Sequence, residues 1–317
     1  MDVETTSKND FIDSSIKNEA KETDQKPISN EKLDWGGSLP FFGVHLIGVL
    51  AIFTGISWIA LAMCVFMYYS RMFAITGAYH RYFSHRTYKT SRFFQFILAF
   101  WGASCGQQGP LWWAAHHRHH HKFSDTDHDI HSAKLRGLWW SHVGWILCKR
   151  YSATNEEAVK DLAQYPELRW INKHHGVPPF ILGASLFFLG VYLQHAAPGL
   201  HTDGIQMLCW GFFTSTTLLY HGTFCINSLA HLIGRKRFDT GDESKNSLIL
   251  SLVTLGEGWH NNHHRFPYCE RQGIYWWEID VSHYVLRVFS WFGLVWDLKL
   301  HPEDIYESGS GKSGMAV

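Results

Sequence analysis

The chain has no excess of charge of either sign and holds few charged residues overall. Its 28 Lys and Arg residues balance 28 Asp and Glu residues, and charged residues make up 18% of the 317 positions, against about 25% in soluble proteins. This balance argues against a strongly basic nucleic-acid-binding protein and against a strongly acidic solvating protein. We therefore expect no nucleic-acid partner.

Cysteine is scarce and shows no framework spacing. No C-x-x-C pair occurs among the six cysteines, which are Cys64, Cys105, Cys148, Cys209, Cys225 and Cys269. A disulfide scaffold and a zinc ribbon are therefore not expected, and a reducing compartment is allowed.

The two ends of the chain lack apolar clusters. Residues 1–34 are rich in Asp, Glu, Lys, Asn and Ser, which is typical of a disordered tail. They contain no basic segment followed by an apolar one, so no secretory signal is predicted. Residues 303–317 are predicted to be a flexible C-terminal tail, which leaves 35–302 as the folded domain.

Long stretches without Lys, Arg, Asp or Glu indicate membrane spans. The first holds 36 residues between Asp34 and Arg71, and later ones cover 174–202 and 204–234. One crossing takes about 20 residues. We therefore predict four transmembrane helices, at about 38–56, 58–79, 177–197 and 205–226.

Two further apolar segments are predicted to lie at the membrane surface. Glycines interrupt the uncharged run 93–117, which favours an interfacial or re-entrant segment over a fifth span. Residues 281–296 repeat apolar side chains every three to four positions, which predicts an amphipathic helix.

The distribution of basic residues predicts the orientation. The turns at 54–57 and 198–204 hold no Lys or Arg, whereas 118–173 and 235–271 hold many. Basic loops stay cytoplasmic, so both termini and the histidine-rich loops are expected in the cytosol. The predicted location is the endoplasmic reticulum membrane in a eukaryote, or the inner membrane in a bacterium.

Histidine is unusually abundant, with 22 residues, many of them in four clusters. The pattern H-x-x-H-H occurs twice, and positions i, i+3 and i+4 of a helix share one side, so each triplet can aim three imidazoles at one point. Imidazole ligands suit iron, zinc, copper or nickel. The sequence thus predicts a two-metal site built from His80–His85, His116–His121, Asn227–His231 and Glu257–His264.

A structural role is the alternative for any single histidine. His45 or His195, taken alone, fits a structural or interfacial position, and the run 116–121 alone also fits a solvated loop. Four clusters predicted on one side of the membrane make coincidence a poor explanation.

The boxes H-x4-H, H-x2-H-H and H-x2-H-H, with the extra N-S-x-A-H, resemble the membrane fatty-acyl desaturases of the stearoyl-CoA (delta-9) type. The resemblance covers about residues 35–302. It rests on the segments His80-Arg81 to His85-Arg86, His117-Arg118 to Lys122-Phe123, Ser141-His142-Val143-Gly144-Trp145, and Gly256-Glu257-Gly258 to His263-His264.

The resemblance implies an all-α integral membrane protein whose cytosolic helical cap holds two iron ions. The second box also fits the register 116/119/120; we choose 117 because the family places Arg directly after the first histidine. Asn227 falls where the family holds a metal-bound water. The implied ligands are His80, His85, His117, His120, His121, His231, His260, His263 and His264.

The implied reaction is the insertion of a cis double bond, at delta-9, into a saturated acyl chain, with O2 as co-substrate. Trp112 and Trp113 resemble the family's tunnel wall, and Gln107 and Gln108 precede them; membrane-interface tryptophans are the alternative for the pair. Acyl-CoA members typically carry Arg-Asp before the second box, where this chain has Ala115-His116. An acyl-lipid or acyl-carrier substrate therefore stays open beside acyl-CoA.

The electrons are expected from a separate donor of the cytochrome b5 or ferredoxin type, because the sequence holds no H-P-G-G haem motif. Such donors are generally acidic, so Arg235, Lys236 and Arg237 are candidates for docking, with membrane topology as their alternative role. A di-iron acyl or alkane hydroxylase fits the same boxes. A histidine-rich metal transporter is a remote alternative. It predicts ionisable residues within the spans, and the predicted spans hold almost no Asp or Glu.

Overall fold

The computed structural model describes residues 31–302 and residue 305. The predicted tails lie outside the described residues, except for 31–34 and 305. Residues 31–34 already contact the rest of the chain: Glu31 accepts hydrogen bonds from Arg136 and Tyr151, and Asp34 N donates to the Leu147 carbonyl at 2.8 Å. Ordered contacts therefore begin before the predicted boundary at residue 35.

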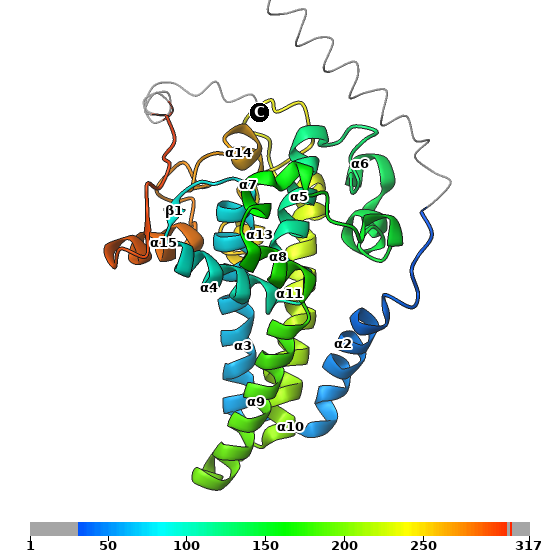
Figure 1. Cartoon of the computed structure of the whole chain (residues 1–317), viewed down its shortest axis with the longest axis vertical. Coiled ribbons are helices and arrows are strands. Elements are labelled where there is room, and N and C mark those ends of the chain that lie inside the picture. The colour runs from blue at the N-terminus through cyan, green and yellow to red at the C-terminus, as the bar shows by residue number, and fades with distance from the viewer. Residues whose placement is uncertain (1–30, 303–304, 306–317) are drawn as a thin grey trace, which may run out of the picture.

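A helical stem carries a broader cap, and both described ends of the chain lie at the cap (Figure 1). The stem contains four continuous helical stretches. They are α2 (Leu39–Leu50) with η1 (Ala51–Thr54), α3 (Trp58–Phe73) with η2 (Ala74–Ser84), α9 (Val177–Ala196), and α10 (Gly204–Leu208) with η7 (Cys209–Thr214) and α11 (Ser215–Asn227). The turn η6 (Pro198–Leu200) lies between α9 and α10 in the stem.

The cap consists of short helices and one two-stranded antiparallel ribbon, in which Lys89 pairs with Trp296. The cap elements are β1 (Lys89–Thr90), α4 (Arg92–Ala103), α5 (Pro110–Phe123), α6 (Ala133–Arg136), η3 (Trp140–Gly144), η4 (Lys149–Tyr151), η5 (Glu157–Val159), α7 (Lys160–Ala163), α8 (Pro166–Lys173), α12 (Leu229–Leu232), α13 (Leu248–Val253), α14 (His260–Arg265), α15 (Val281–Trp291) and β2 (Val295–Trp296).

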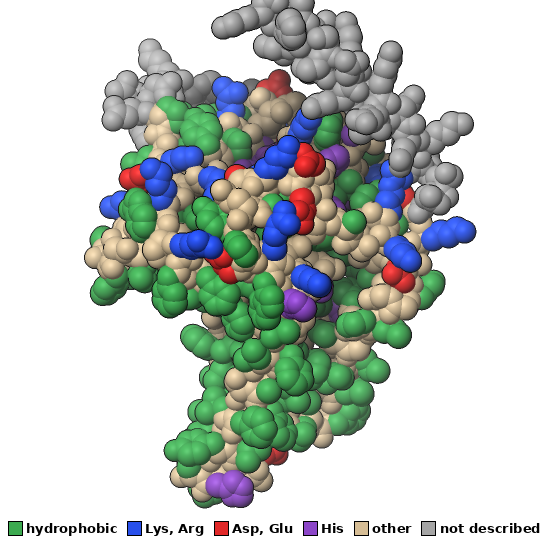
Figure 2. Space-filling view, in the orientation of Figure 1, with side chains coloured by type: hydrophobic (Ala, Val, Ile, Leu, Met, Phe, Trp, Pro, Cys, Tyr) green, Lys and Arg blue, Asp and Glu red, His purple; other side chains and the backbone are tan. Residues whose placement is uncertain are grey.

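The four stem stretches lie close to the four predicted spans. Among the described residues, two of them, Trp58–Ser84 and Val177–Ala196, are long and apolar enough to cross a membrane, and Leu39–Thr54 is shorter. Apolar side chains cover the visible face of the stem, whereas Lys, Arg, Asp and Glu gather on the cap (Figure 2). Large side chains such as Phe53 and Phe188 are 79% and 66% exposed. The exposed apolar stem is consistent with membrane association.

Local sequence signals explain where several helices begin. Ser57 and Ser91 each accept a hydrogen bond from the backbone N–H three residues later, which caps α3 and α4. Pro110 lies in the first turn of α5, where its missing N–H costs nothing. The interrupted run 93–117 thus forms α4, a turn through Gly106 and Gly109, and α5.

The predicted surface helix at 281–296 is shorter than expected. The helix α15 begins at Val281 and ends at Trp291. Gly293 follows with φ of +68°, a conformation that favours glycine and ends a helix. Val295 therefore belongs to β2 and pairs with Thr90, so the prediction was wrong for the last turn.

Candidate metal centre

The nine predicted histidine ligands gather in the cap and at the adjoining end of η2, as two groups. In each group, one nitrogen of every ring lies within 4.8 Å of the nitrogens of the others. Cluster A contains His80, His85, His117, His121 and His263. Cluster B contains His120, His231, His260 and His264.

The two H-x-x-H-H triplets are each divided between the clusters. On α5, His117 and His121 enter cluster A, whereas His120 enters cluster B. On α14, His260 and His264 enter cluster B, whereas His263 enters cluster A. Residues four apart differ by about 40° around a helix and residues three apart by about 60° in the opposite direction, so i and i+4 aim together and i+3 aims aside. The expectation that each triplet converges on one point was wrong.

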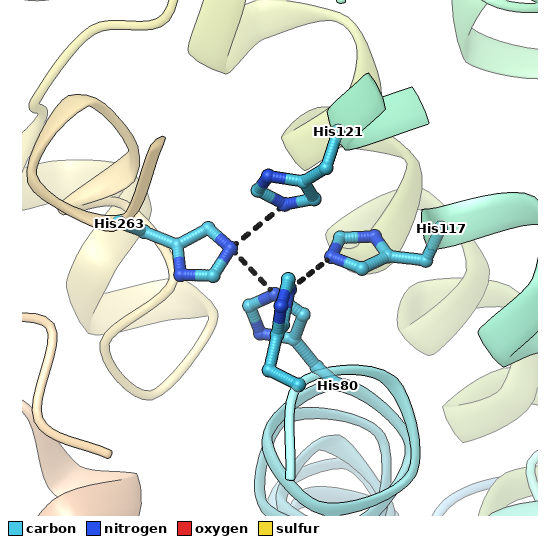
Figure 3. A group of neighbouring side chains, drawn as sticks. His80, His117, His121 and His263 are labelled. Atoms are coloured by element: carbon cyan, nitrogen blue, oxygen red, sulfur yellow. Dashed lines mark hydrogen bonds between the residues drawn. The ribbon is translucent and has the colours of Figure 1, made fainter. Parts of the chain in front are cut away.

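Cluster A joins the first, second and fourth histidine boxes. Figure 3 shows His80, His117, His121 and His263 pointing toward one another from three elements. His263 Nε2 lies 3.0 Å from His80 Nε2 and 2.9 Å from His121 Nε2. His85 Nε2 lies 2.8 Å from His117 Nε2.

Arg118 holds the first and second boxes together. Its guanidinium donates to the Phe83 and Ser84 carbonyls at 2.9 Å and to Asp161 at 2.7 Å. These carbonyls lie at the end of the π-helix η2, where backbone acceptors need partners. The arginine after His117 therefore fixes the turn that presents His85.

A buried arginine positions the first box against the fourth. Arg81 donates to Glu257 at 2.6 Å and to Asp280 at 3.0 Å, all within the protein interior. Glu257 in turn lies 2.5 Å from His80 Nδ1. Gly256 precedes it with φ of +123°, and a Cβ there would lie 2.3 Å from an Asp280 oxygen. This position therefore requires glycine.

Cluster B is surrounded by carboxylates. His231 Nδ1 lies 3.0 Å from Asp125, His264 Nδ1 lies 2.5 Å from Asp242, and His120 Nδ1 lies 3.2 Å from Asp129. Each ionised carboxylate can only accept, so these three Nδ1 atoms carry the protons. The Nε2 atoms then hold lone pairs that face inward, as in carboxylate–histidine–metal arrangements.

The pKa shifts of the buried groups favour neutral rings for most of the candidate ligands, except His120, where burial lowers the pKa but Asp129 outweighs it and raises the pKa above its usual value. Burial lowers the pKa of His117 and of His260 well below the usual value, and neighbouring imidazoles lower it further. Burial alone raises the pKa of Asp242, but the hydrogen bond and charge of His264, together with hydrogen bonds from Ser244 and Thr240, outweigh it and hold that pKa well below its usual range. The same balance, with His231 as partner, lowers the pKa of Asp125 to about 2.

The donor set fits a metal ion at each cluster. His120 Nε2 and His264 Nε2 are buried and have no hydrogen-bond partner in the described part of the chain. His231 Nε2, which holds a lone pair because Nδ1 carries the proton, lies 3.1 Å from His260 Nε2. Buried polar atoms of native proteins are normally paired, and inward-facing lone pairs are satisfied by a cation. Imidazole sets of this kind suit first-row transition metals, iron included.

A cavity of about 230 Å³ reaches cluster A. Its wall includes His117 together with the predicted metal-water residue Asn227. All four predicted substrate residues also line it: Gln107, Gln108, Trp112 and Trp113.

A model of the family described as fatty acid desaturase matches residues 56–295. The chain belongs to the fatty acid desaturase family. The resemblance inferred from the histidine boxes is thereby confirmed.

Curated members of the desaturase family are similar over most of the chain. The sn-1 stearoyl-lipid 9-desaturase of Anabaena variabilis is 34% identical over 273 residues, which is 85% of this chain and 95% of that protein. The delta-9 acyl-lipid desaturase 2 of Arabidopsis thaliana is 35% identical over 275 residues, 86% of this chain and 85% of that protein. The acyl-CoA C20 delta-5 desaturase of Anemone leveillei is 31% identical over 269 residues, 84% of this chain and 81% of that protein. These relatives differ in both acyl carrier and double-bond position.

The alternative register of the second box fails in this desaturase. His116 Nδ1 lies 2.9 Å from the Trp112 carbonyl, and His119 Nε2 lies 2.9 Å from the His128 carbonyl. Neither ring belongs to cluster A or cluster B. The structure therefore brings together the 117/120/121 register.

The predicted docking residues are only partly available. Arg237 is paired with the buried Glu278, and Lys236 Nζ lies 3.4 Å from Glu243. Together with Arg235 they line a surface hollow that also contains Trp259, the residue before His260. The basic segment therefore lies on the cluster B side of the cap.

Sequence reasoning missed the carboxylates and one further histidine. Asp125, Asp129 and Asp242 carry no spacing that assigns them to particular histidines. His131 lies with His120 and Asp129 in a third group of potential ligands, and its ring also lines the cavity. The D-x-H pattern at 129–131 was the available signal.

Proposed function

We propose that this family member is a membrane di-iron desaturase that inserts a cis double bond, at delta-9, into a saturated acyl chain. It uses O2 and two electrons from a separate donor. The observation that carries the proposal is the pair of inward-facing histidine clusters next to a cavity lined by the two tryptophans.

The nine clustered histidines hold the two iron ions, with Asn227 contributing through a water. When bound, the irons supply the activated oxygen that removal of hydrogen from an unactivated methylene group requires. The balanced reaction converts –CH2–CH2–, O2, two electrons and two protons into –CH=CH– and two water molecules. The protein's own part is to position the chain and to exclude water.

The cavity wall is built to be rigid. Gln107 Nε2 donates to Thr223 Oγ1 at 3.0 Å, and the Tyr220 hydroxyl donates to the Gly106 carbonyl at 2.9 Å. Trp113 stacks on His117 with ring centroids 5.0 Å apart. An acyl chain has no polar group near its middle, so such a wall is needed to fix which carbons lie beside the metal.

The exposed apolar stem supports a site at a membrane surface. We propose that all four stem stretches cross the bilayer and that the cap, with both termini, faces the cytosol. Arg71 is compatible with this arrangement, because its buried guanidinium donates to Ser215 and Thr216 at 2.6 and 2.8 Å within the stem. Intramembrane arginines normally find such partners inside the bundle.

The acyl carrier remains a choice between CoA and a lipid. The buried Ala115 and the cavity-lining His116 occupy the positions where the acyl-CoA members of the family typically carry Arg-Asp. Acyl-CoA and acyl-lipid substrates should therefore be compared directly on the purified enzyme.

Expression in a host that requires unsaturated fatty acids tests the proposal. We expect growth without added unsaturated lipid and a new cis-monounsaturated product, located by mass spectrometry. His263→Ala is the inactive control, and His195→Ala, an exposed residue of α9, is the matched active control. A hydroxylated product would show a hydroxylase, and no product from a well-expressed, iron-loaded protein would refute the proposal.

A further inference from the structure

Three histidines outside the two clusters form a row between stem and cap. His45 lies on α2, His221 on α11 and His142 on η3. His45 Nε2 lies 3.3 Å from His221 Nε2, and His221 Nδ1 lies 3.0 Å from His142 Nε2. His221 is exposed, and the other two rings are partly buried.

The outer nitrogens of the row determine where its protons lie. His45 Nδ1 lies 2.7 Å from the Phe41 carbonyl oxygen, which can only accept, so this nitrogen carries the proton. His142 Nδ1 lies 2.9 Å from Ser228 Oγ, whose hydroxyl donates to the Phe224 carbonyl at 2.8 Å. His142 Nδ1 therefore carries its proton too. In the neutral rings both Nε2 atoms present lone pairs to the middle ring.

The middle ring, His221, therefore meets an acceptor at each end. A neutral imidazole has one N–H and can donate to only one of them. When His221 Nδ1 donates to His142, the 3.3 Å contact with His45 brings two lone pairs together. Two nitrogen ligands of a tetrahedral site with bonds of about 2.0–2.1 Å are separated by about the same distance.

We propose that a divalent transition-metal ion of the zinc, copper or nickel class binds between His45 Nε2 and His221 Nε2. Imidazole is a favoured ligand of these ions. His142 acts on the ion only through the middle ring, whose tautomer it fixes. Because His142 belongs to the cap, the row lies at the end of the stem nearest the cap, where the exposed side of His221 gives the ion access and leaves positions for water.

The ion ties the cavity wall together. Phe41, one turn before His45, stacks on Tyr220 with ring centroids 5.7 Å apart, and both rings line the cavity. Tyr220 directly precedes His221. Binding therefore fixes α2 against α11 at the wall, independently of the two clusters.

The test uses the full chain without a polyhistidine tag, loaded with iron and titrated with zinc. Zinc and iron per chain are measured by mass spectrometry after gel filtration. His45→Ala and His221→Asn should each hold one zinc ion fewer than wild type, with iron unchanged. The asparagine amide can still donate toward His142 but lacks Nε2. His195→Ala, on an exposed ring of α9, should bind zinc as wild type does.

Equal zinc uptake by wild type and both variants would overturn the proposal. A second measurement does not depend on the variants folding. One equivalent of Cu²⁺ added to the iron-loaded wild type should show hyperfine coupling to two imidazole nitrogens by electron paramagnetic resonance. Coupling to no nitrogen would contradict the site.

Discussion

Cluster A and cluster B draw on the same sequence boxes but differ in their surroundings. In cluster A, five imidazoles converge and His80 alone has a carboxylate contact, to Glu257, among the residues described. In cluster B, four imidazoles converge and three of them contact carboxylates. Hydrogen bonds to carboxylates make histidines more basic and fix their tautomer.

Equal ligand types therefore need not give equal metal sites. A cation bound in cluster B would lie close to three anionic groups, whereas cluster A would offer it a nearly neutral shell with one more imidazole. We therefore expect affinity to come mainly from charge in cluster B and from the number of ligands in cluster A.

Removing a ligand should have the largest effect in both clusters. His263→Ala in cluster A or His260→Ala in cluster B should lower activity by more than ~100-fold, since loss of an outer-shell partner alone costs about 10- to 100-fold. Iron content per chain and product formation are the measurements. Full activity of either variant, with His195→Ala normal as control, would contradict the assignment of that cluster.

Acid should empty both clusters. A histidine must be unprotonated to bind metal, and the lowered pKa values of His117 and His260 keep these rings neutral at pH 7. Iron is therefore retained at neutral pH and lost as the pH falls through these lowered values. Dialysis across a pH series, followed by iron analysis, measures the loss. Because the pKa of His264 is lowered to about 4, unchanged iron well below pH 4 would argue against histidine ligation.

Neutralising the carboxylates should separate the two clusters. Asp242→Asn removes an anion from cluster B and should weaken iron binding about 10- to 100-fold. Glu257→Gln is the matched change beside cluster A, where it also removes a partner of the buried Arg81. Mössbauer spectra of the partly loaded proteins should show a different iron lost in each variant. Loss of the same iron from both variants would contradict the proposed difference between cluster A and cluster B.

The smallest effect is expected at the donor surface on the cluster B side. Arg235→Glu should slow reduction by an acidic donor a few-fold and flatten its dependence on salt, because complementary charge mainly raises association rates. Lys236→Glu, whose native partner is Glu243, should have a weaker effect. Stopped-flow reduction at several ionic strengths measures both. Rates and salt dependence equal to wild type would refute docking at this surface.

Much of the site could be predicted because its residues form recognisable patterns over short stretches of the sequence. The spacing of His117, His120 and His121 marks them as ligands, and the uncharged runs mark the stem. The prediction failed where angles mattered, since a helix assigns i+3 and i+4 to different directions. It also failed at Asp125 and Asp242, which are common residue types at unremarkable spacing.

Residues close together in the chain were enough to predict the candidate ligand types, the family and the approximate bounds of the stem helices. Which histidine joins which cluster, and which carboxylate contacts it, depends on tertiary packing. His80 and His263 are 183 positions apart, yet their Nε2 atoms lie 3.0 Å from each other. Such a pairing depends on long-range contacts such as those of the buried Arg81 on η2 with Glu257, three residues before α14, and with Asp280, and local periodicity carries no information about it.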